Sequence, residues 1–249
     1  MTDGRVSASR RGDYGFDAPY VPLLLSVGGL ALVAAAALNL SAGSPEGALL
    51  CGLGAALLLA SSASYVYTTR RGKFEVWSGL LNHLTVRGDE QLLDVGCGRG
   101  AVLNMAAQLV PRGGAVGVDL WKSADQSGNA MEMTQRNAEL EGVAERVQLK
   151  TGDMRELPFA DSSFDLVVSS LAIHNVPDAE GRARSIAEAV RVLRPGGRLL
   201  VADIRSARQY AERLRQLSMS AVKLRSLGWR FWYGGPWMAT TLVSAVKPR

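Results

Sequence analysis

Residues 92–100 read LLDVGCGRG, an apolar run that passes directly into glycines at every second position. The apolar run predicts a buried strand, and the apolar stretch from residue 101 predicts a helix after the glycines. Glycine lets the backbone turn tightly and approach a ligand, with peptide N–H groups presented at the helix N-terminus. The spacing G-x-G-x-G differs from the dinucleotide pattern G-x-G-x-x-G, although Ala101 occupies the last position of that pattern.

Short strand-like runs alternate with helical stretches on both sides of this turn. We predict strands over 91–95, 115–120, 146–151, 164–169 and 198–204, with two further β-like runs at 219–225 and 240–246. We predict helices over 73–84, 101–110, 129–141, 179–193 and 207–217. Alternation of this kind predicts an α/β sandwich with a mainly parallel sheet.

Polar residues follow several of the predicted strands. Asp119 ends the strand after the glycine turn, where a carboxylate can accept hydrogen bonds from two ribose hydroxyls. Asp153 follows the third strand in a Gly-Asp-Met sequence, and LRPGG at 193–197 precedes the fifth. His174 follows the fourth strand, and an imidazole can act as a general base near neutral pH. A purely structural role for His174 is the alternative.

A block of fifty residues, 20–69, contains a single charged residue, Glu46. Residues 20–42 and 45–68 are each long enough, at about 1.5 Å per residue, to cross a hydrocarbon core roughly 30 Å thick. Basic residues flank the block on both outer sides, so the positive-inside rule places both ends in the cytoplasm. We predict a transmembrane hairpin of a multi-pass membrane protein, in contact with membrane lipids. A signal peptide, buried core helices and surface helices are the alternatives.

The composition limits the remaining possibilities. The chain has 249 residues, 47% of them hydrophobic, and a net charge of +5. Two cysteines and two histidines exclude a disulfide scaffold and a multi-histidine metal site, so we predict no metal. The predicted organisation is a cytoplasmic N-terminal segment (1–19), the hairpin (20–69) and a cytoplasmic globular domain (70–249).

Five motifs, in their order along the chain, resemble those of class I S-adenosylmethionine-dependent methyltransferases. The resemblance is in particular to the small-molecule branch that includes quinone and sterol methyltransferases. The five motifs are LLDVGCGRG, GVDLW, TGDMRELPF, FDLVVSSLAIHNV and LRPGGRLLVAD, and the resemblance covers roughly residues 73–247. It implies a Rossmann-like sandwich with a seven-stranded sheet, helices on both faces and an antiparallel last strand. Residues 240–246 would supply that strand.

The resemblance also implies a set of cofactor-binding residues. Asp94 and the glycine turn after it would hold the methionine part of S-adenosylmethionine. Asp119, which ends the second strand, would bind the ribose. The residues after that acid would pack on the adenine, and the Gly-Asp-Met sequence would meet its amino group. The serines that end the fourth strand would lie near the transferring methyl group. These residues are Asp94, Gly96, Gly98, Gly100, Asp119, Leu120, Trp121, Asp153, Met154, Ser169 and Ser170.

The predicted function is therefore methyl transfer from S-adenosylmethionine to a small apolar or lipid-like acceptor, with His174 as the candidate base. A nicotinamide-dependent oxidoreductase and a non-catalytic cofactor-binding module on the same fold are the alternatives. Nucleic-acid amino-methylation uses a motif such as Asn-Pro-Pro-Tyr after the fourth strand, where this chain has Ser169-Ser170-Leu171-Ala172. No nucleic-acid partner is expected. The aromatic stretch 229–237 is predicted to line a substrate cavity, to lie at the membrane interface, or simply to pack.

Overall fold

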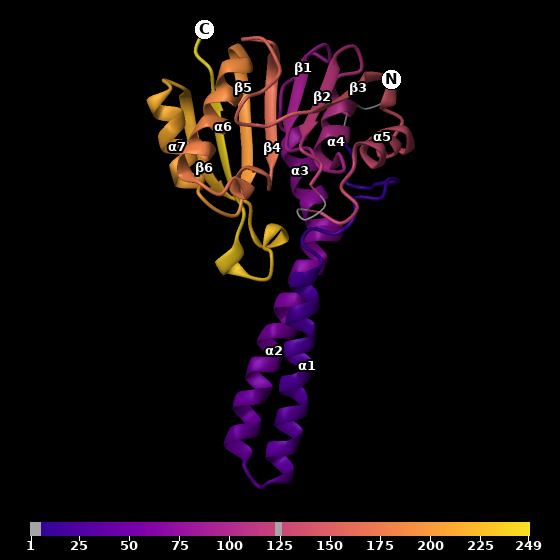
Figure 1. The fold of residues 1–249 in the computed structure, drawn as a ribbon, viewed down its shortest axis with the longest axis vertical. Coiled ribbons are helices and arrows are strands. Elements are labelled where there is room, and N and C mark those ends of the chain that lie inside the picture. The colour runs from indigo at the N-terminus through magenta and orange to yellow at the C-terminus, as the bar shows by residue number, and fades with distance from the viewer. Residues whose placement is uncertain (1–5, 123–125) are drawn as a thin grey trace.

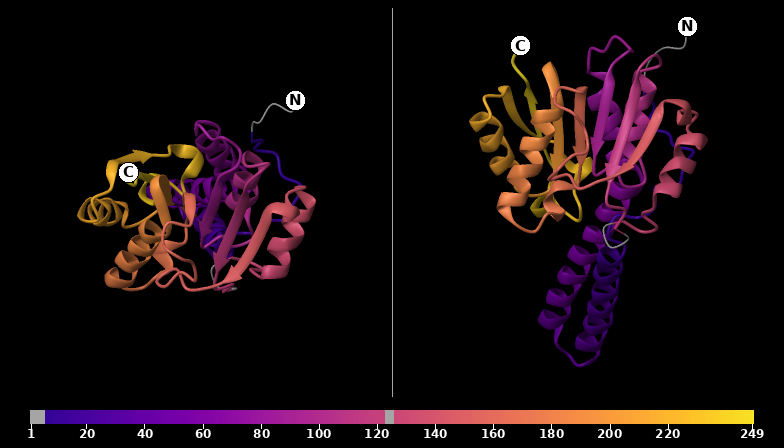
Figure 2. Two further views of the ribbon diagram at one scale, coloured as in Figure 1. Left: turned by 90° about the horizontal axis from the view of Figure 1, so that it is seen from above. Right: turned by 45° about the horizontal axis from the view of Figure 1, so that its top comes forward.

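The computed structural model describes residues 6–122 and 126–249. A two-helix hairpin projects from one end of an α/β sandwich (Figure 1 and Figure 2). The hairpin consists of α1 (Tyr20–Ser41) and α2 (Pro45–Tyr67), and both helices are long and apolar enough to cross a membrane. They approach closely because a Cβ on Gly29 would lie 2.7 Å from Cγ of Leu59 on the other helix. Small residues at such a contact are typical of packed membrane helices.

Helix α2 continues beyond the apolar block. A π-helical turn, η1 (Thr68–Gly72), joins it to α3 (Lys73–Asn82), so one helical segment runs from Pro45 to Asn82. The sequence predicts the helix from residue 73 but not this connection. The hairpin and the sandwich therefore share one continuous helix.

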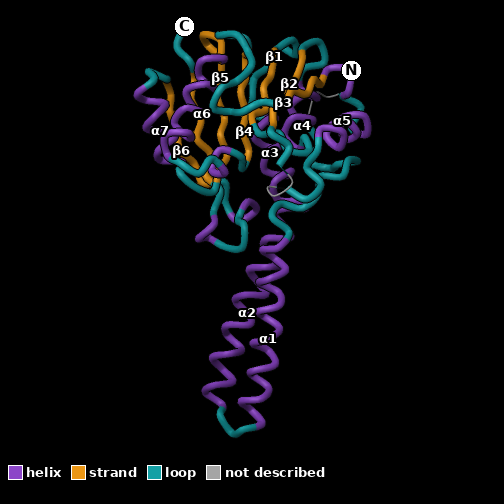
Figure 3. Tube along the Cα trace, viewed as in Figure 1, coloured by secondary structure: helices purple, strands orange, loops and turns teal. Residues whose placement is uncertain are grey.

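Seven strands form one sheet in the order β3-β2-β1-β4-β5-β7-β6 (Figure 3). The parallel strands are β1 (Gln91–Val95), β2 (Gly114–Asp119), β3 (Val147–Thr151), β4 (Phe164–Ser170) and β5 (Leu193–Asp203). Strand β7 (Thr241–Val246) lies antiparallel between β5 and β6 (Ser220–Ser226). The predicted seven-stranded sheet with an antiparallel last strand is confirmed.

Helices cover both faces of the sheet (Figure 1). Besides α3 they are α4 (Ala101–Leu109), α5 (Met131–Leu140), α6 (Ala179–Val192) and α7 (Ala207–Gln216). Short turns lie at η2 (Ala144–Arg146), η3 (Ile173–Asn175), η4 (Trp229–Phe231) and η5 (Pro236–Met238). One predicted boundary was wrong: residues 193–197 belong to β5 because Leu193 already pairs with Phe164, and helix α6 ends at Val192.

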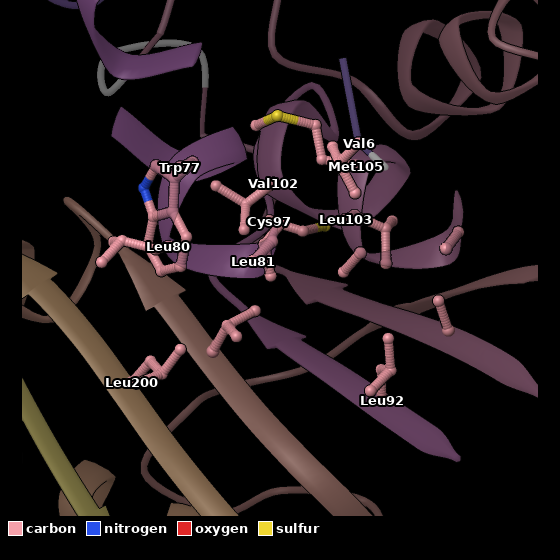
Figure 4. Packing of buried hydrophobic residues seen from close by; sticks show 14 of the residues in the cluster. Val6, Trp77, Leu80, Leu81, Leu92, Cys97, Val102, Leu103, Met105 and Leu200 are labelled. Carbon is pink, nitrogen blue, oxygen red and sulfur yellow. The ribbon is translucent and has the colours of Figure 1, made fainter. Parts of the chain in front are cut away.

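The core lies in two layers, one on each face of the sheet. Successive strand residues point to opposite faces, so Leu92 of β1 packs with α3 and α4, whereas Leu93 packs with α6 and α7. Figure 4 shows the first layer, in which Trp77 of α3 is only 1% exposed. The helix that continues the hairpin is therefore part of the core of the sandwich.

The carboxyl ends of the parallel strands lie at the end of the sandwich from which the hairpin projects (Figure 1). The structure links the two directly, because Trp77 Nε1 donates a hydrogen bond of 2.9 Å to Oγ of Ser170, the last residue of β4. Ligands of open α/β sheets bind beyond the carboxyl ends of the strands where the strand order reverses. In this sheet that place lies beyond β1 and β4.

Candidate functional site

The turn after β1 has a backbone conformation that requires glycine. Gly96, Gly98 and Gly100 have φ of +73°, +50° and +82°, a region that side chains other than glycine rarely adopt. A Cβ on Gly96 would overlap Ala172, and one on Gly98 would lie 2.7 Å from Oε1 of Gln126. The loop after β4 and the segment around Gln126 therefore both lie against this glycine turn.

Asp119 joins the end of β2 to the glycine turn. Its Oδ2 accepts the N–H of Gly98 at 2.8 Å, and its Oδ1 accepts the N–H of Trp121 at 2.7 Å. Oδ1 also accepts from Asn129 Nδ2 at 3.4 Å. An ionised carboxylate has about four acceptor positions, so Oδ2 keeps capacity for a ligand. The structure thus brings Asp119 and the glycine turn together.

Asp94 lies below the turn in a dry environment. Its side chain is buried, and within residues 6–122 and 126–249 its Oδ1 has no hydrogen-bond partner. Burial, with a smaller effect of the charge of Asp119, raises the pKa of Asp94 to about 8. A buried carboxyl with a perturbed pKa and an unused oxygen is typical of a ligand site.

The raised pKa predicts how Asp94→Asn changes stability. The folded protein keeps a proton that the unfolded chain loses above about pH 4, so stability falls as pH rises from about 4 to 8. Asn carries no such charge. The variant should therefore unfold at a higher temperature than the parent near pH 8. Its gain in free energy of unfolding over the parent should grow by at most about 1.4 kcal/mol per pH unit. Thermal unfolding from pH 5 to 8.5 measures this gain.

Asp89→Asn is the matched control, because the Asp89 side chain is 51% exposed in a surface pair with Arg87. It should leave the unfolding temperature nearly unchanged over the same range. A gain for Asp94→Asn that does not vary with pH would contradict the assigned pKa.

Asp153 and Met154 lie at the same edge of the sheet. Asp153 forms an ion pair with Arg155, with 2.5 Å between Oδ2 and Nη2, and hydrogen bonding to Arg155 lowers the pKa of this carboxyl. Cε of Met154 lies 3.4 Å from the position that a Cβ on Gly96 would take. Met154 is thus beside the glycine turn, whereas the carboxylate of Asp153 already has a cationic partner.

The two serines that end β4 have partners within the protein. Ser169 Oγ donates to the carbonyl of Val95 at 2.8 Å, across to β1. Ser170 Oγ accepts from Trp77, as described above, and keeps its own O–H free to donate. Ser169 therefore links the ends of β1 and β4, and of these two serines only Ser170 has a hydroxyl proton available for a ligand.

Backbone strain marks two positions just beyond the strand ends. Trp121 after β2 and Leu171 after β4 have φ of +55° and +56°. Non-glycine residues in this region cost of order 1–3 kcal/mol and cluster at functional sites. Trp121 is held by a hydrogen bond from Nε1 to Thr151 Oγ1 at 2.9 Å, and the neighbouring Leu120 is exposed.

His174 forms a dyad with Asp203, a residue that the sequence did not single out. Nδ1 of His174 lies 2.6 Å from Oδ1 of Asp203, which ends β5 and is 1% exposed. The same carboxylate accepts the N–H groups of His174 and Ile204, and the hydroxyl of Tyr210 at 3.1 Å. Burial raises the pKa of Tyr210, with a further contribution from Asp203, so its hydroxyl remains a donor.

These contacts determine the tautomer of His174. A carboxylate only accepts hydrogen bonds, so Nδ1 of His174 carries the proton that points to Asp203. In the neutral ring Nε2 then has a free lone pair. The arrangement is that of a general base oriented by an acid. It stands beside the cofactor-binding candidates because Ala172, two residues earlier, touches the glycine turn.

The N-terminal segment, residues 6–19, packs on this side of the sandwich. Asp13 forms an ion pair of 2.9 Å with Arg99 of the glycine turn. Gln126 links the two from the other side: its Oε1 accepts the N–H of Arg99, and its Nε2 donates to the carbonyl of Tyr14, both at 3.0 Å. Nothing in the sequence identified Gln126 as part of this contact.

Asp17 connects four parts of the molecule. Its carboxylate accepts from Lys73 Nζ and from the Tyr233 hydroxyl, both at 2.8 Å, and from Gln126 Nε2 at 3.0 Å. Its carbonyl accepts the hydroxyl of Tyr65 at 3.1 Å. Helix α3, the aromatic loop, the segment beside the glycine turn and helix α2 therefore meet at one residue.

The chain is similar to known methyltransferases. Residues 93–201 match a family model described as "Methyltransferase domain". Methyltransferase GfsG of Streptomyces halstedii is 38% identical over 125 residues, which is 50% of this chain and 41% of that protein. The ubiquinone/menaquinone biosynthesis C-methyltransferase UbiE of Dinoroseobacter shibae is 38% identical over 136 residues, 53% of this chain and 50% of that protein.

The fold is also similar to that of methyltransferases of known structure. Geranyl diphosphate methyltransferase, in a structure with S-adenosylmethionine, superposes with a TM-score of 0.56 at 19% identity, over 76% of this chain and 90% of that one. The chain spans about half the length of the curated relatives that it matches. The matched residues include the glycine turn, Asp119, Asp153 and His174, and the match favours a methyltransferase over a nicotinamide-dependent oxidoreductase. Residues 93–201 therefore belong to the methyltransferase domain family, and the sandwich has the fold of S-adenosylmethionine-dependent methyltransferases.

Proposed function

We propose that the protein is a membrane-anchored methyltransferase that uses S-adenosylmethionine to methylate a small apolar or lipid-like acceptor. The position of the site relative to the hairpin carries this proposal. The glycine turn, Asp119 and His174 lie at or just after the carboxyl ends of β1, β2 and β4. These strand ends are at the end of the sandwich from which α1 and α2 project (Figure 1). In a membrane-anchored protein this edge would face the bilayer surface, where an apolar acceptor is available. The similarity to an enzyme of quinone biosynthesis also supports such an acceptor.

The exposure of the hairpin supports its insertion in a membrane. Leu24, Leu38 and Leu50 are 66%, 69% and 71% exposed, and only a small share of α1 and α2 is buried. A core helix of a water-soluble protein would bury such residues, because exposed apolar surface costs about 25 cal/mol per Å². The basic residues at 5–11 and 70–73 favour a cytoplasmic location for both ends of the chain and for the catalytic domain.

The residues at the site fit S-adenosylmethionine. The glycine turn leaves no room for side chains, so the backbone can approach the methionine part, and the unpaired oxygen of Asp94 suits its ammonium group. The carboxylate of Asp119 suits the ribose hydroxyls. Met154 and Leu120 would pack on the adenine. Asp153 would meet the adenine amino group while still paired with Arg155, and Ser170 would lie near the methyl group.

The protein's part in the reaction is orientation, exclusion of water and removal of a proton. When bound, S-adenosylmethionine supplies a methyl group activated by its sulfonium. His174 Nε2 would accept the proton of an acceptor hydroxyl or acidic C–H. Asp203 would keep the ring in the required tautomer and stabilise the positive charge that develops on it. An intact dyad of this kind favours an enzyme over a non-catalytic binding module.

A labelling experiment tests the proposed function. The full-length protein in detergent is incubated with S-adenosylmethionine carrying a deuterated methyl group and, separately, with the lipid and the aqueous extracts of its host cells. Mass spectrometry should find the label in a compound of the lipid extract. Label only in the aqueous extract would contradict an apolar acceptor. Cofactor binding without label in either extract would favour the non-catalytic module.

Asp119→Ala should weaken binding of the demethylated cofactor. Loss of charge-assisted hydrogen bonds to a diol costs about 1–3 kcal/mol, or about 5- to 150-fold in Kd. Calorimetric titration with S-adenosylhomocysteine measures this loss. Asp119→Asn, which keeps one acceptor oxygen, should lose less. Equal, unchanged affinities in both folded variants would place Asp119 outside the cofactor site.

The hairpin should keep the protein in membranes through carbonate and high-salt washes, because apolar spans of this length leave a bilayer only in detergent. A reporter fused at Gly43 should report the outer side, and one at Arg249 the cytoplasm. Release into the soluble fraction would show that the apolar block does not span. An outer location for both reporters would contradict the proposed topology.

A further inference from the structure

A groove of about 640 Å³ lies along the hairpin where it meets the sandwich. Leu59, Ala63 and Val66 of α2 give it an apolar wall. Ser26 of α1 and Ser62 of α2 also line it, and their hydroxyls share a hydrogen bond of 2.8 Å. Ser62 Oγ donates to the carbonyl of Pro22 at 3.0 Å, so Ser26 is the donor to Ser62 and both hydroxyls are satisfied. The rest of the α2 wall is apolar.

Two arginines close the groove at the end of the membrane-spanning helix. Arg70 and Arg71 line it, and both are exposed. Arg70 lies over the ring of Phe16, with its guanidinium carbon 5.3 Å from the centroid. In the part of the chain that the structure describes, neither arginine forms an ion pair. Glu75 pairs with Arg230 and Asp17 pairs with Lys73. The charge of Arg70 acts on the carboxyl of Asp13, which itself pairs with Arg99. The groove therefore has an apolar length and an uncompensated positive end.

Aromatic residues indicate where this positive end lies relative to the surface of the membrane. Tyr67, which also lines the groove, stacks on Trp229 with 5.3 Å between ring centroids. Trp229 and Trp237 of the aromatic loop are 55% and 62% exposed. Exposed tryptophans and tyrosines of membrane proteins lie at the level of the lipid headgroups. The arginines of the groove are next to this aromatic belt, and the apolar wall continues toward the membrane side.

We infer that this groove binds one anionic membrane phospholipid, with its phosphodiester on Arg70 and Arg71 and the start of an acyl chain along Leu59, Ala63 and Val66. The inference rests on the proposed membrane insertion of the hairpin. Guanidinium groups recognise phosphate oxygens through paired N–H donors. Because no carboxylate is among the described residues that line the groove, a lipid of net negative charge is preferred over a zwitterionic one. The bound lipid would lie between the spans and the edge of the sheet that carries the cofactor site.

Native mass spectrometry of the full-length protein in detergent tests this inference. The protein is titrated with phosphatidylglycerol and with phosphatidylcholine of the same acyl chains. It should retain one phosphatidylglycerol with a preference of about tenfold or more. Arg71→Gln should reduce that preference about fivefold, since one basic residue near an anionic surface contributes about that factor. The double variant Arg70→Gln/Arg71→Gln should abolish the preference.

The double variant Arg208→Gln/Arg215→Gln is the matched control, because it removes the same charge from exposed positions on α7. It should retain the preference. Equal binding of the two lipids by the parent protein would overturn the inference, as would equal losses in the two double variants. Release from membranes without detergent would instead refute the membrane insertion, so the two failures are distinguishable.

Discussion

Replacing His174 by alanine should lower kcat by about 10²- to 10⁴-fold, the usual contribution of a general base. The structure supports this expectation because Asp203 holds the Nδ1 proton of His174 and leaves Nε2 to accept one. The ascending limb of the pH profile of kcat should disappear with the imidazole. Single-turnover kinetics on the acceptor found by the labelling experiment would measure both effects.

Two further variants distinguish a role of His174 as general base from a purely structural role. Asp203→Asn should lower kcat as well, because an amide can present its N–H to Nδ1 and favour the wrong tautomer. Tyr210→Phe removes only one donor to Asp203 and should cost much less. The affinity of His174→Ala for S-adenosylhomocysteine should stay within about twofold of the parent. A large loss of that affinity would place His174 in the cofactor site and end its candidacy as base.

The sheet could be predicted because its evidence is local. Strands β1, β2 and β5 contain short apolar runs that end at a glycine or an acid, and an apolar run of this length is recognisable as a strand without knowledge of its partners. The glycine turn, Asp119 and Asp153 are each next to the end of a strand. Because parallel strands end at one edge, their proximity followed from the order of the motifs.

The π-helical turn could not be predicted, because distant residues determine it. The residues TTRRG at 68–72 include β-branched threonines and a glycine, which favour the end of a helix. In the structure Thr68 donates to the carbonyl of Trp232 at 2.7 Å, and Gly72 lies so close to Arg230 that a Cβ would overlap its carbonyl. Contacts with a loop about 160 residues away therefore override the local preference.

Long-range contacts also determine the roles of Asp203, Asp17 and Gln126, which the sequence analysis did not identify as site residues. Asp203 was quoted only as the end of a strand motif, and 29 residues separate it from His174. Asp17 and Gln126 are more than 100 residues apart, and neither lies in a recognisable motif. Their roles arise from the packing of the N-terminal segment on the glycine turn, which depends on the path of the chain through the hairpin.

Gly98→Val should abolish cofactor binding, with a loss of at least about 100-fold in affinity for S-adenosylhomocysteine. Gly98 has φ of +50°, where a β-branched residue is strained, and a Cβ would lie 2.7 Å from Oε1 of Gln126. The added side chain would occupy the space that the cofactor needs and would displace the amide that accepts the N–H of Arg99. Calorimetric titration at matched protein concentration measures the loss.

Backbone strain and blocked space can be separated by a second glycine. Gly142 has φ of +70° but nothing within 4 Å of its Cβ position. Gly142→Val therefore carries the strain of a left-handed residue, about 1–2 kcal/mol, without filling the site. It should unfold at a lower temperature yet bind S-adenosylhomocysteine normally. If Gly98→Val also bound normally, the glycine turn would not hold the cofactor. If both variants lost affinity equally, the loss would come from strain in the fold, because of the two glycines only Gly98 adjoins Asp119 and Gln126.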